Sequence, residues 1–331
     1  MGFGQIGRQI YRLSLEDPRF DTVAISDIGQ PDILHHLLAK SIGRASRVVL
    51  DGNYLVAGEC RTRLMPAERP GEIPWDLLGV DVVIDATGRY RSRTSLAPHL
   101  DSGASRVVTS SLPEGDVDRV VLCGVNEDSA ASGDRIVSAG SASTAAMALA
   151  LRVVTAARPI AHATMTSVHA YTRDQALYDH AGPDYRRSRA AAGNIIPNTT
   201  PALEWVERAL PVVKGKLSGF ALNVPVAAGS LLDVTLAFQD SAMAADEING
   251  LFVAAAEAEP ELIAVTHDPI VSSDVRGCSQ SILIDLQGTL AAGEKLTKVL
   301  AWHETLGHAR RTLDVAALYA KVDSETTTGA S

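Results

Sequence analysis

The sequence predicts an α/β protein of two domains, in which a parallel sheet is followed by a mostly antiparallel one. The chain has 331 residues, its first half alternates short apolar runs with helical stretches, and its second half contains longer strands. Because a single core rarely grows beyond roughly 250–300 residues, this length favours two domains. The change of pattern between the halves indicates that the two domains differ in architecture.

The first half contains short apolar runs, each of the length expected for one buried strand. Helical stretches separate these runs. Strands that are apolar throughout are typical of a parallel sheet that helices cover on both faces. In chain order, the predicted strands are Thr22–Ser26, Asp81–Asp85, Arg106–Thr109, Val120–Cys123 and Arg135–Ser138.

The pattern changes near Ala142, where a buried helix rich in Ala, Leu and Val is predicted over Thr144–Ala157. Longer strands follow without a helix after each, which favours antiparallel pairing. The predicted strands are Ala163–Tyr171, Lys216–Val224 and Ser230–Phe238. We therefore predict a first domain over residues 1–141, a second over 142–302, an amphipathic helix over 303–322 that packs back on the first domain, and a flexible polar tail over 323–331.

Composition excludes several classes of function. The formal net charge of −9 argues against nucleic-acid and anionic-membrane partners, because both need clustered Lys and Arg. Neither an apolar run of membrane-spanning length nor a signal-peptide pattern is found, so we expect no membrane partner. Cys60, Cys123 and Cys278 are widely spaced, which favours a reducing cytoplasm and predicts no metal site.

A glycine motif at the start of the chain predicts a nucleotide site. Gly2, Gly4 and Gly7 form Gly-x-Gly-x-x-Gly, and a helix is expected directly afterwards. Glycines at this spacing let the backbone approach a pyrophosphate, whose charge the helix N-terminal amides stabilise. Asp27 follows at the end of the next predicted strand, where a carboxylate accepts hydrogen bonds from a ribose 2′-hydroxyl and repels a 2′-phosphate. The pattern indicates a Rossmann-type domain that binds NAD rather than NADP; a tight turn without a ligand is the alternative.

The position of this motif raises a structural question. A Rossmann motif normally follows the first strand of the sheet, whereas here it begins directly after Met1. Without that central strand, its neighbours are expected to be unpaired and apolar surface to be exposed. Either the start of the protein lies upstream of Met1, or the fold tolerates the gap and binds nucleotide less well.

Further motifs occur in order through both halves of the chain. They are Gly2–Arg8, Ala86–Gly88, Gly124–Asn126, Met165–Ala170, Arg186–Ala191 and Asn194–Pro197. Together they resemble the glyceraldehyde-3-phosphate dehydrogenase family over nearly the full length. The resemblance implies an NAD-binding Rossmann domain followed by an α+β catalytic domain. It also implies a cofactor site formed by Gly2, Phe3, Gly4, Gln5, Ile6, Gly7, Asp27, Arg69, Thr87, Gly88 and Ser110.

The chain departs from this family at the catalytic nucleophile. The family motif Ala-Ser-Cys-Thr-Thr-Asn-Cys reads Gly-Ser-Ala-Ser-Thr-Ala-Ala over residues 140–146, so that Ala142 stands in the cysteine position. The family reaction needs a thiolate to attack an aldehyde, and the hydroxyls of Ser141 and Ser143 are far less acidic than a thiol. His169 remains from the catalytic pair as a candidate acid or base, or as a relic bonded to a neighbouring backbone group.

The positions that bind phosphate in the family have changed as well. Asn223 stands where the family has an arginine, Asp174 replaces a threonine, and Pro201 removes a backbone N–H donor. These changes predict a neutral or cationic substrate, unless Arg187 or Arg189 pairs with Asp174 and leaves the pocket near neutral. The predicted substrate pocket comprises Ser141, Ser143, Thr172, Asp174, Thr200 and Asn223.

The start of the C-terminal helix is altered too. Residues 302–307 are one residue shorter than the family's Trp-Tyr-Asp-Asn-Glu-x-Gly and lack the asparagine that fixes the nicotinamide amide. His303 and His308 near the start of this helix are predicted to be exposed, with a contact to the cofactor side as the alternative. Arg173 and Asp174 form either a pocket pair or a solvated surface pair.

Three functions remain open at this point. The favoured one is an NAD-dependent oxidoreductase that exchanges a hydride with a non-phosphorylated small molecule, with His169 as acid or base. The others are a non-redox lyase, cyclase or isomerase that reuses the pocket, and a catalytically silent binding paralogue. The family is tetrameric, and the loop over residues 174–193 keeps Tyr178, Tyr185 and Arg186, which suit a subunit interface. We therefore expect a cytoplasmic homotetramer.

Overall fold

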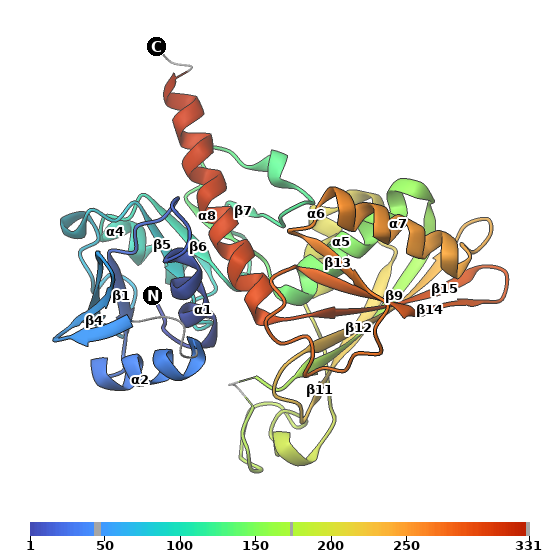
Figure 1. Ribbon diagram of the computed structural model, residues 1–331, viewed down its shortest axis with the longest axis horizontal. Helices are drawn as coiled ribbons and strands as arrows, with labels where there is room; N and C mark the ends of the chain where they lie inside the picture. The colour runs from blue at the N-terminus through green and yellow to red at the C-terminus, as the bar shows by residue number, and fades with distance from the viewer. Residues whose placement is uncertain (43–47, 173–174, 329–331) are drawn as a thin grey trace. The chain divides into compact units, whose positions relative to one another are not determined.

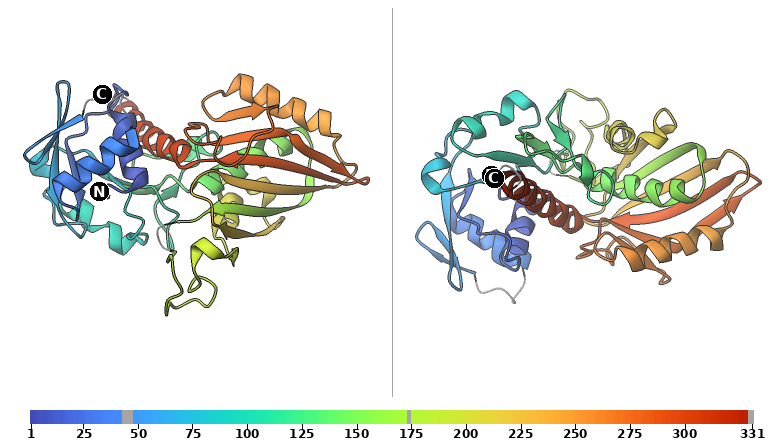
Figure 2. Two further views of the ribbon diagram at one scale, coloured as in Figure 1. Left: turned by 60° about the horizontal axis from the view of Figure 1, so that its bottom comes forward. Right: turned by 90° about the horizontal axis from the view of Figure 1, so that it is seen from above.

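The computed structural model describes residues 1–42, 48–172 and 175–328 of the chain (Figures 1 and 2). It divides into two compact units, the first formed by Met1–Gly140 with His308–Ser331 and the second by Ser141–Gly307. Among the described residues, no helix has both the length and the apolar character needed to cross a membrane.

The first unit contains two four-stranded sheets. In the first sheet the order is β1 (Ala24–Asp27), β4 (Cys60–Pro66), β3 (Tyr54–Ala57) and β2 (Val48–Asp51). In the second, wholly parallel sheet it is β5 (Val82–Asp85), β6 (Arg106–Thr109), β8 (Ile136–Ser138) and β7 (Arg119–Val120). The helices of this unit are α1 (Gln5–Ser14), α2 (Pro31–Ile42), α3 (Arg93–Leu96), α4 (Pro98–Asp101) and most of α8 (Thr305–Thr328).

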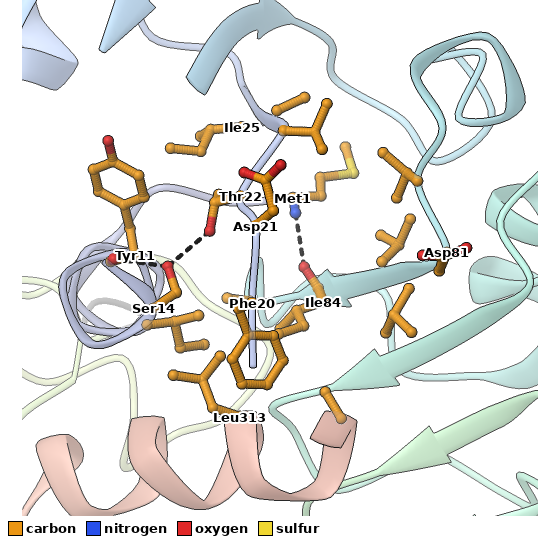
Figure 3. A pocket seen from close by; sticks show the side chains of 18 of the residues that line it. Met1, Tyr11, Ser14, Phe20, Asp21, Thr22, Ile25, Asp81, Ile84 and Leu313 are labelled. Atoms are coloured by element: carbon orange, nitrogen blue, oxygen red, sulfur yellow. Dashed lines mark hydrogen bonds between the residues drawn. The ribbon is translucent and has the colours of Figure 1, made fainter. Parts of the chain in front are cut away.

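A cavity of about 530 Å³ separates β1 from β5 (Figure 3). Met1 donates from its ammonium to Ile84 O (2.7 Å) and accepts from Ala86 N (2.8 Å), while Gly2 N donates to Ser26 O (2.8 Å). Met1 and Gly2 therefore lie between the carboxyl ends of β1 and β5. They are hydrogen-bonded to both sides, as the end of a strand between β1 and β5 would be. Along the rest of their length, β1 pairs with β4 and β5 pairs with β6. Residues of β1 and β5 thus line a common cavity with a mostly apolar lining.

The second unit contains one seven-stranded sheet. Four of its six neighbouring strand pairs are antiparallel, in agreement with the prediction of a mostly antiparallel sheet. The order is β10 (Ile196–Asn198), β11 (Leu217–Val224), β9 (Ile160–Ala170), β12 (Ser230–Phe238), β15 (Leu296–His303), β14 (Ile282–Ala292) and β13 (Ile263–Thr266). Helices α5 (Ala142–Ala157), α6 (Ala202–Ala209) and α7 (Ala245–Ala258) pack on this sheet (Figure 1).

Alternation of buried and less buried residues along the central strands forms the core of this unit, although Trp302 near the end of β15 is buried as well. On β12, every second residue from Ser230 to Phe238 is buried. The same alternation on β15 buries Thr297, Val299, Ala301 and His303. Since side chains on a strand alternate between the two faces, these residues form the face on which the helices pack.

The C-terminal helix begins later and ends later than predicted. His303 is the last residue of β15 and not the first residue of the helix, because it continues the two-residue alternation of that strand. The helix starts after Glu304, whose carboxylate accepts a hydrogen bond from Leu306 N (2.7 Å). The predicted flexible tail is helical as far as Thr328, with Asp323 bound to Arg106 Nη2 (3.1 Å). Residues 329–331 lie outside the described part of the chain.

The remaining predicted strands agree with the structure to within a few residues, with one exception. The run over 120–123 was expected to be a strand, but only Arg119–Val120 pairs as β7. The chain turns after it because Asn126 Oδ1 accepts from Leu122 N (2.7 Å) and Asn126 Nδ2 donates to Val120 O (2.9 Å). A side chain therefore replaces the next strand pairing.

Candidate functional site

The glycine motif of the first unit is packed tightly against the turn that follows β5. A Cβ atom on Gly2 would lie 2.7 Å from Thr87 N, and the φ of Gly2 is +87°. A Cβ on Gly7 would lie 2.0 Å from Gly2 O, whereas one on Gly4 would have nothing within 4 Å. Two glycines are therefore required by packing. Gly4, the N-cap of α1, is left for close approach of a ligand to the helix N-terminus.

Asp27 is held at the end of β1 by the same loop. Its Oδ2 accepts a hydrogen bond from Phe3 N (2.6 Å), and its Oδ1 accepts one from Gly29 N (2.9 Å). Each carboxylate oxygen has a second lone pair, so these bonds orient the group without using up its capacity to accept. These two bonds fix the orientation of the carboxylate at the end of β1.

Asp85 belongs to this part of the first unit, although no sequence motif marks it. It is fully buried at the end of β5, and its Oδ1 accepts from Thr87 N (2.9 Å) and Thr87 Oγ1 (2.7 Å). Its Oδ2 lies 3.4 Å from His99 Nε2, and Trp75 Nε1 donates to His99 Nδ1 (3.2 Å). Because Nδ1 accepts from the indole, the neutral His99 carries its proton on Nε2 and donates it to Asp85. The only signal in the sequence is a carboxylate at the end of an apolar strand.

Burial controls the charge of His99 and of the chain's first amine. Desolvation lowers the pKa of His99 below its ordinary value, opposed in part by Asp85. Desolvation also lowers the pKa of the Met1 ammonium, opposed in part by the charges of Asp85 and Asp27. Both groups are thus biased towards neutrality around the Asp85 carboxylate.

The other predicted cofactor residues belong to the same unit. Ser110 is buried, its N–H donates to Asp85 O (2.9 Å), and its carbonyl accepts from His308 Nε2 (2.7 Å).

The prediction that His308 is exposed was wrong: only 5% of it is accessible, because the first turns of α8 pack into this unit. Desolvation lowers the pKa of His308, so it is neutral. Arg69 is exposed just after β4, and Gly88 lies in the turn that Asp85 holds.

In the second unit, the sequence that resembles the family's cysteine motif begins α5. Ser141 is the N-cap, and its Oγ accepts from Thr144 N (3.2 Å) and shares a 2.7 Å hydrogen bond with Thr144 Oγ1. Ala142 is the first residue of the helix, and Ser143 Oγ lies 3.3 Å from Ser141 Oγ. The hydroxyl of Ser141 is therefore used to cap the helix.

His169 lies one residue before the end of β9. Its Nδ1 is 2.6 Å from Ala170 O. Since a carbonyl oxygen only accepts, Nδ1 carries the proton and the neutral ring presents Nε2 as a lone pair. This tautomer is the one that a general base requires.

The prediction that His303 is an exposed helix residue was also wrong. His303 is 2% exposed, and its ring lies edge-on to His169 with 6.0 Å between the two centroids. The alternating pattern of β15 would have indicated its burial, but the histidine was assigned to the following helix.

Three other predicted substrate residues, Asn223, Thr200 and Thr172, have hydrogen bonds of their own. Asn223 is buried, accepts from Asn198 Nδ2, and is linked through Asn198 Oδ1 to Arg187 Nε (3.2 Å). Thr200 Oγ1 accepts from Ala202 N (3.2 Å) at the start of α6, and Thr172 N donates to Gln175 Oε1 (3.1 Å). Arg173 and Asp174 lie outside the described residues.

Two further expectations concern charges and metals. Arg189 forms an ion pair with Asp179 (3.0 Å) on the exposed loop. Within the described ranges, no group of three or more His, Cys, Asp or Glu side chains is arranged to hold a metal ion.

The first unit packs a glycine loop on a strand end and holds a carboxylate at the end of β1, and the second unit contains a mostly antiparallel sheet. Together these features are typical of an NAD-binding two-domain dehydrogenase. Residues 1–93 match the family model "Glyceraldehyde 3-phosphate dehydrogenase, NAD binding domain", and residues 141–305 match "Glyceraldehyde 3-phosphate dehydrogenase, C-terminal domain". The chain belongs to the glyceraldehyde-3-phosphate dehydrogenase family, whose cofactor is NAD.

Curated relatives align with this chain over nearly all of its length. Glyceraldehyde-3-phosphate dehydrogenase 1 of Bacillus subtilis is 37% identical over 328 residues, covering 97% of each chain. Glyceraldehyde-3-phosphate dehydrogenase of Geobacillus stearothermophilus is 36% identical over 326 residues, covering 96% of each. The enzyme of that name from Kitasatospora aureofaciens is 39% identical over 328 residues, covering 96% of this chain and 97% of its own.

Proposed function

We propose that this protein is an NAD-dependent oxidoreductase that acts on a non-phosphorylated small molecule and forms no acyl-enzyme. The observation that carries the proposal is Ala142 at the first position of α5. A helix N-terminus stabilises a thiolate, and the family reaction needs such a thiolate to attack an aldehyde and hold a thioester. A methyl group at this position can do neither.

The other sulfur atoms of the chain do not replace this nucleophile. Cys278 is the one cysteine of the second unit, and desolvation raises the pKa of its thiol. Desolvation raises the pKa of Cys123 in the first unit to about 12. Such thiols are protonated at neutral pH and are poor nucleophiles. Cys60 is exposed on β4 of the first unit.

His169 retains the chemistry that a direct hydride transfer requires. NAD, when bound, supplies the hydride acceptor. His169 Nε2 then takes the proton of the substrate hydroxyl as the carbonyl forms, and returns it in the reverse direction. The hydrogen bond from Nδ1 to Ala170 O fixes the ring in the required tautomer. Oxidation of an alcohol by this route needs no covalent intermediate.

The polar groups around Asn223 support a substrate without a phosphate. Relative to the family pattern, Asn223 removes one positive charge and Asp174 adds one negative charge. The amide of Asn223 is already bonded to Asn198, and Arg187 approaches that amide pair from the exposed loop. A dianion would gain no direct charged partner from Asn223, and burying an unpaired charge costs several kcal/mol.

We further propose that the protein is a cytoplasmic homotetramer. Tyr178 and Tyr185 on the loop before β10 are 83% and 97% exposed, and Leu177 is 63% exposed. Exposed aromatic and aliphatic side chains on one loop are typical of an interface. We expect the mass of a tetramer, or at least of a dimer, by light scattering at micromolar concentration, and a monomeric mass would contradict this part of the proposal.

The central experiment combines nucleotide binding with oxidation assays. Calorimetry should show NAD binding by the full chain, and NADH formation should be tested on a panel of non-phosphorylated alcohols, polyols, amino alcohols and aldehydes. His169→Asn is expected to lower turnover about 10²–10⁴-fold while leaving the NAD affinity unchanged. His162→Asn, an exposed change on the same strand, is the control. Absence of NAD binding, or full turnover by His169→Asn, would refute the proposal.

A further inference from the structure

The carboxylate of Asp85 is the meeting point of three hydrogen bonds at the end of β5. Thr87 N and Thr87 Oγ1 donate to its Oδ1 at 2.9 and 2.7 Å, and His99 Nε2 lies 3.4 Å from its Oδ2. All three groups are donors, which suits a carboxylate because it only accepts. Asp85 and His99 are fully buried, where a polar group that loses its partner is most costly.

The turn after β5 is closed by bonds that begin at this carboxylate. Thr87 Oγ1 donates to Asp85 and also accepts from Arg89 N (3.1 Å). Gly88, an exposed residue of the turn, lies between the two residues that these bonds hold. One carboxylate oxygen of Asp85 therefore sets the path of the chain over residues 86–89.

The same turn packs on the glycine loop. Ala86 N donates to Met1 O (2.8 Å), and a Cβ atom on Gly2 would lie 2.7 Å from Thr87 N. Met1 also donates from its ammonium to Ile84 O near the end of β5 (2.7 Å, Figure 3). A displacement of the turn would move the backbone of Gly2 with it, because the two segments are closely packed and hydrogen-bonded.

This contact extends from the turn to Asp27. Gly2 N donates to Ser26 O (2.8 Å), and Phe3 N donates to Asp27 Oδ2 (2.6 Å). A glycine loop and a carboxylate at the carboxyl ends of parallel strands are the features that hold a dinucleotide in folds of this type. Hydrogen bonds and packing thus connect the buried Asp85 to both of them.

We propose that Asp85 is a positioning residue of the NAD site, which acts through the turn over residues 86–89 on the glycine loop. This role requires no contact between Asp85 and the nucleotide. The inference rests on the NAD binding that the proposed function requires, but not on the reaction or its substrate. Trp75 and His99 support the same role, since Trp75 Nε1 donates to His99 Nδ1 (3.2 Å) and leaves the proton on Nε2 for Asp85.

The fixed direction of these bonds predicts the effect of an amide in place of the carboxylate. Asp85→Asn has nearly the same shape, but its NH₂ group must face either the N–H of Thr87 or the Nε2 proton of His99. His99 cannot avoid this conflict by changing its tautomer, because a proton on Nδ1 would then face the indole N–H of Trp75. The variant therefore keeps the volume of the side chain and loses a buried hydrogen bond.

The first test measures the NAD affinity of the full chain by calorimetry. We expect Asp85→Asn to weaken NAD binding about ten- to hundredfold, through the lost bond in the network. Leu96→Ala removes buried apolar groups from α3 outside this network, so it is the control for lost stability and should leave NAD affinity unchanged. Equal NAD affinity of the wild type and Asp85→Asn would overturn this inference and leave the proposed function intact, whereas no NAD binding by the wild type would refute both.

A double-mutant cycle tests the role of Trp75 and His99. Trp75→Phe removes the indole N–H, so that His99 can carry its proton on Nδ1 and accept from the amide of Asp85→Asn through Nε2. Asp85→Asn should therefore lower NAD affinity less in the Trp75→Phe background than in the wild type. Equal losses in both backgrounds would contradict the part assigned to Trp75 and His99.

Hydrogen exchange of the Thr87 and Arg89 amides, measured without NAD, reports on the turn itself. Both amides should exchange faster in Asp85→Asn and keep their wild-type rates in Leu96→Ala. A loss of NAD affinity without faster exchange at these two amides would show that Asp85 does not act through the turn. If Asp85→Asn does not fold, His99→Leu leaves Asp85 Oδ2 without its donor and should weaken NAD binding about three- to tenfold, and an unchanged affinity would overturn the proposal.

Discussion

The first unit builds its site from the backbone, whereas the second builds its site from side chains. Gly2, Gly7 and Asp27 act through close approach and through bonds to main-chain N–H groups, so a change in any of them alters the path of the chain. Ala142 and Asn223 occupy positions where a different side chain would leave the helix or strand intact. Reaction chemistry can therefore change in the second unit without loss of the fold, while the cofactor site of the first unit cannot change as freely.

The largest expected effect is the loss of the family reaction through the side chain of Ala142 in the second unit. Because Ala142 cannot form a thioester, NADH formation from glyceraldehyde 3-phosphate and inorganic phosphate should be about 10⁴–10⁶-fold below that of an enzyme with the cysteine. A coupled spectrophotometric assay measures this rate. Rates typical of the relatives would show that Ala142 does not prevent the family reaction.

Ala142→Cys sharpens the same test. A thiol at the first position of α5 should have its pKa lowered by the helix N-terminus and react faster with iodoacetamide than Cys278 does. It should not restore full phosphorylating activity, since Asn223 and Asp174 remain. Full recovery from this single change would mean that the phosphate positions are unimportant.

The next effect concerns the backbone of the first unit. Gly7→Ala places a Cβ 2.0 Å from Gly2 O and should destabilise this unit by about 2–4 kcal/mol, with NAD affinity reduced more than about tenfold. Gly4→Ala, where nothing lies within 4 Å, should leave stability almost unchanged and weaken NAD binding alone. Denaturant unfolding and calorimetry separate the two. Equal loss of stability in both variants would show that Gly4 is as necessary for packing as Gly7.

A smaller effect is expected for nucleotide choice. Asp27→Asn keeps one amide oxygen as the acceptor for Phe3 N, loses the bond from Gly29 N, and removes the charge that opposes a 2′-phosphate. The preference for NAD over NADP should therefore narrow by about 1–2 kcal/mol, or roughly five- to thirtyfold in affinity. Titration with both nucleotides measures it, and an unchanged preference would assign selectivity to another residue.

The smallest effect is the pH dependence of the first unit. His99 and His308 are buried and neutral, with pKa values lowered from 6.5 by desolvation. Below pH 6.5 the unfolded chain binds these protons and the folded one does not, so stability is full above that pH and falls as the pH is lowered. The slope is at most about 1.4 kcal/mol per pH unit for each histidine.

Amide hydrogen exchange on β6 measures this dependence within the first unit. His308→Gln should reduce the slope between pH 6.5 and 5, and His36→Gln, an exposed change on α2, should not. Equal slopes in the wild type and His308→Gln would show that His308 is not the group responsible.

The sequence determined the architecture and the cofactor class of this protein. The apolar runs and the spacing of the glycines from one another and from Asp27 lie within short stretches of the chain. Such stretches can be recognised from periodicity and turn chemistry alone. The absence of a thiol at Ala142 likewise needs no coordinates. These features were accessible because each depends on residues that are near one another along the chain.

The tertiary structure decided which distant residues meet. Asp85, His99 and Trp75 come from separate elements and meet only in the folded first unit. His303 lies near His169 because β12 pairs with both β9 and β15 and brings these two strands into one sheet. His303 was misassigned because a strand end and a helix start are hard to separate by pattern alone. Strand order and register arise from packing across the whole sheet, so the partners of a buried side chain are set by contacts far away in sequence.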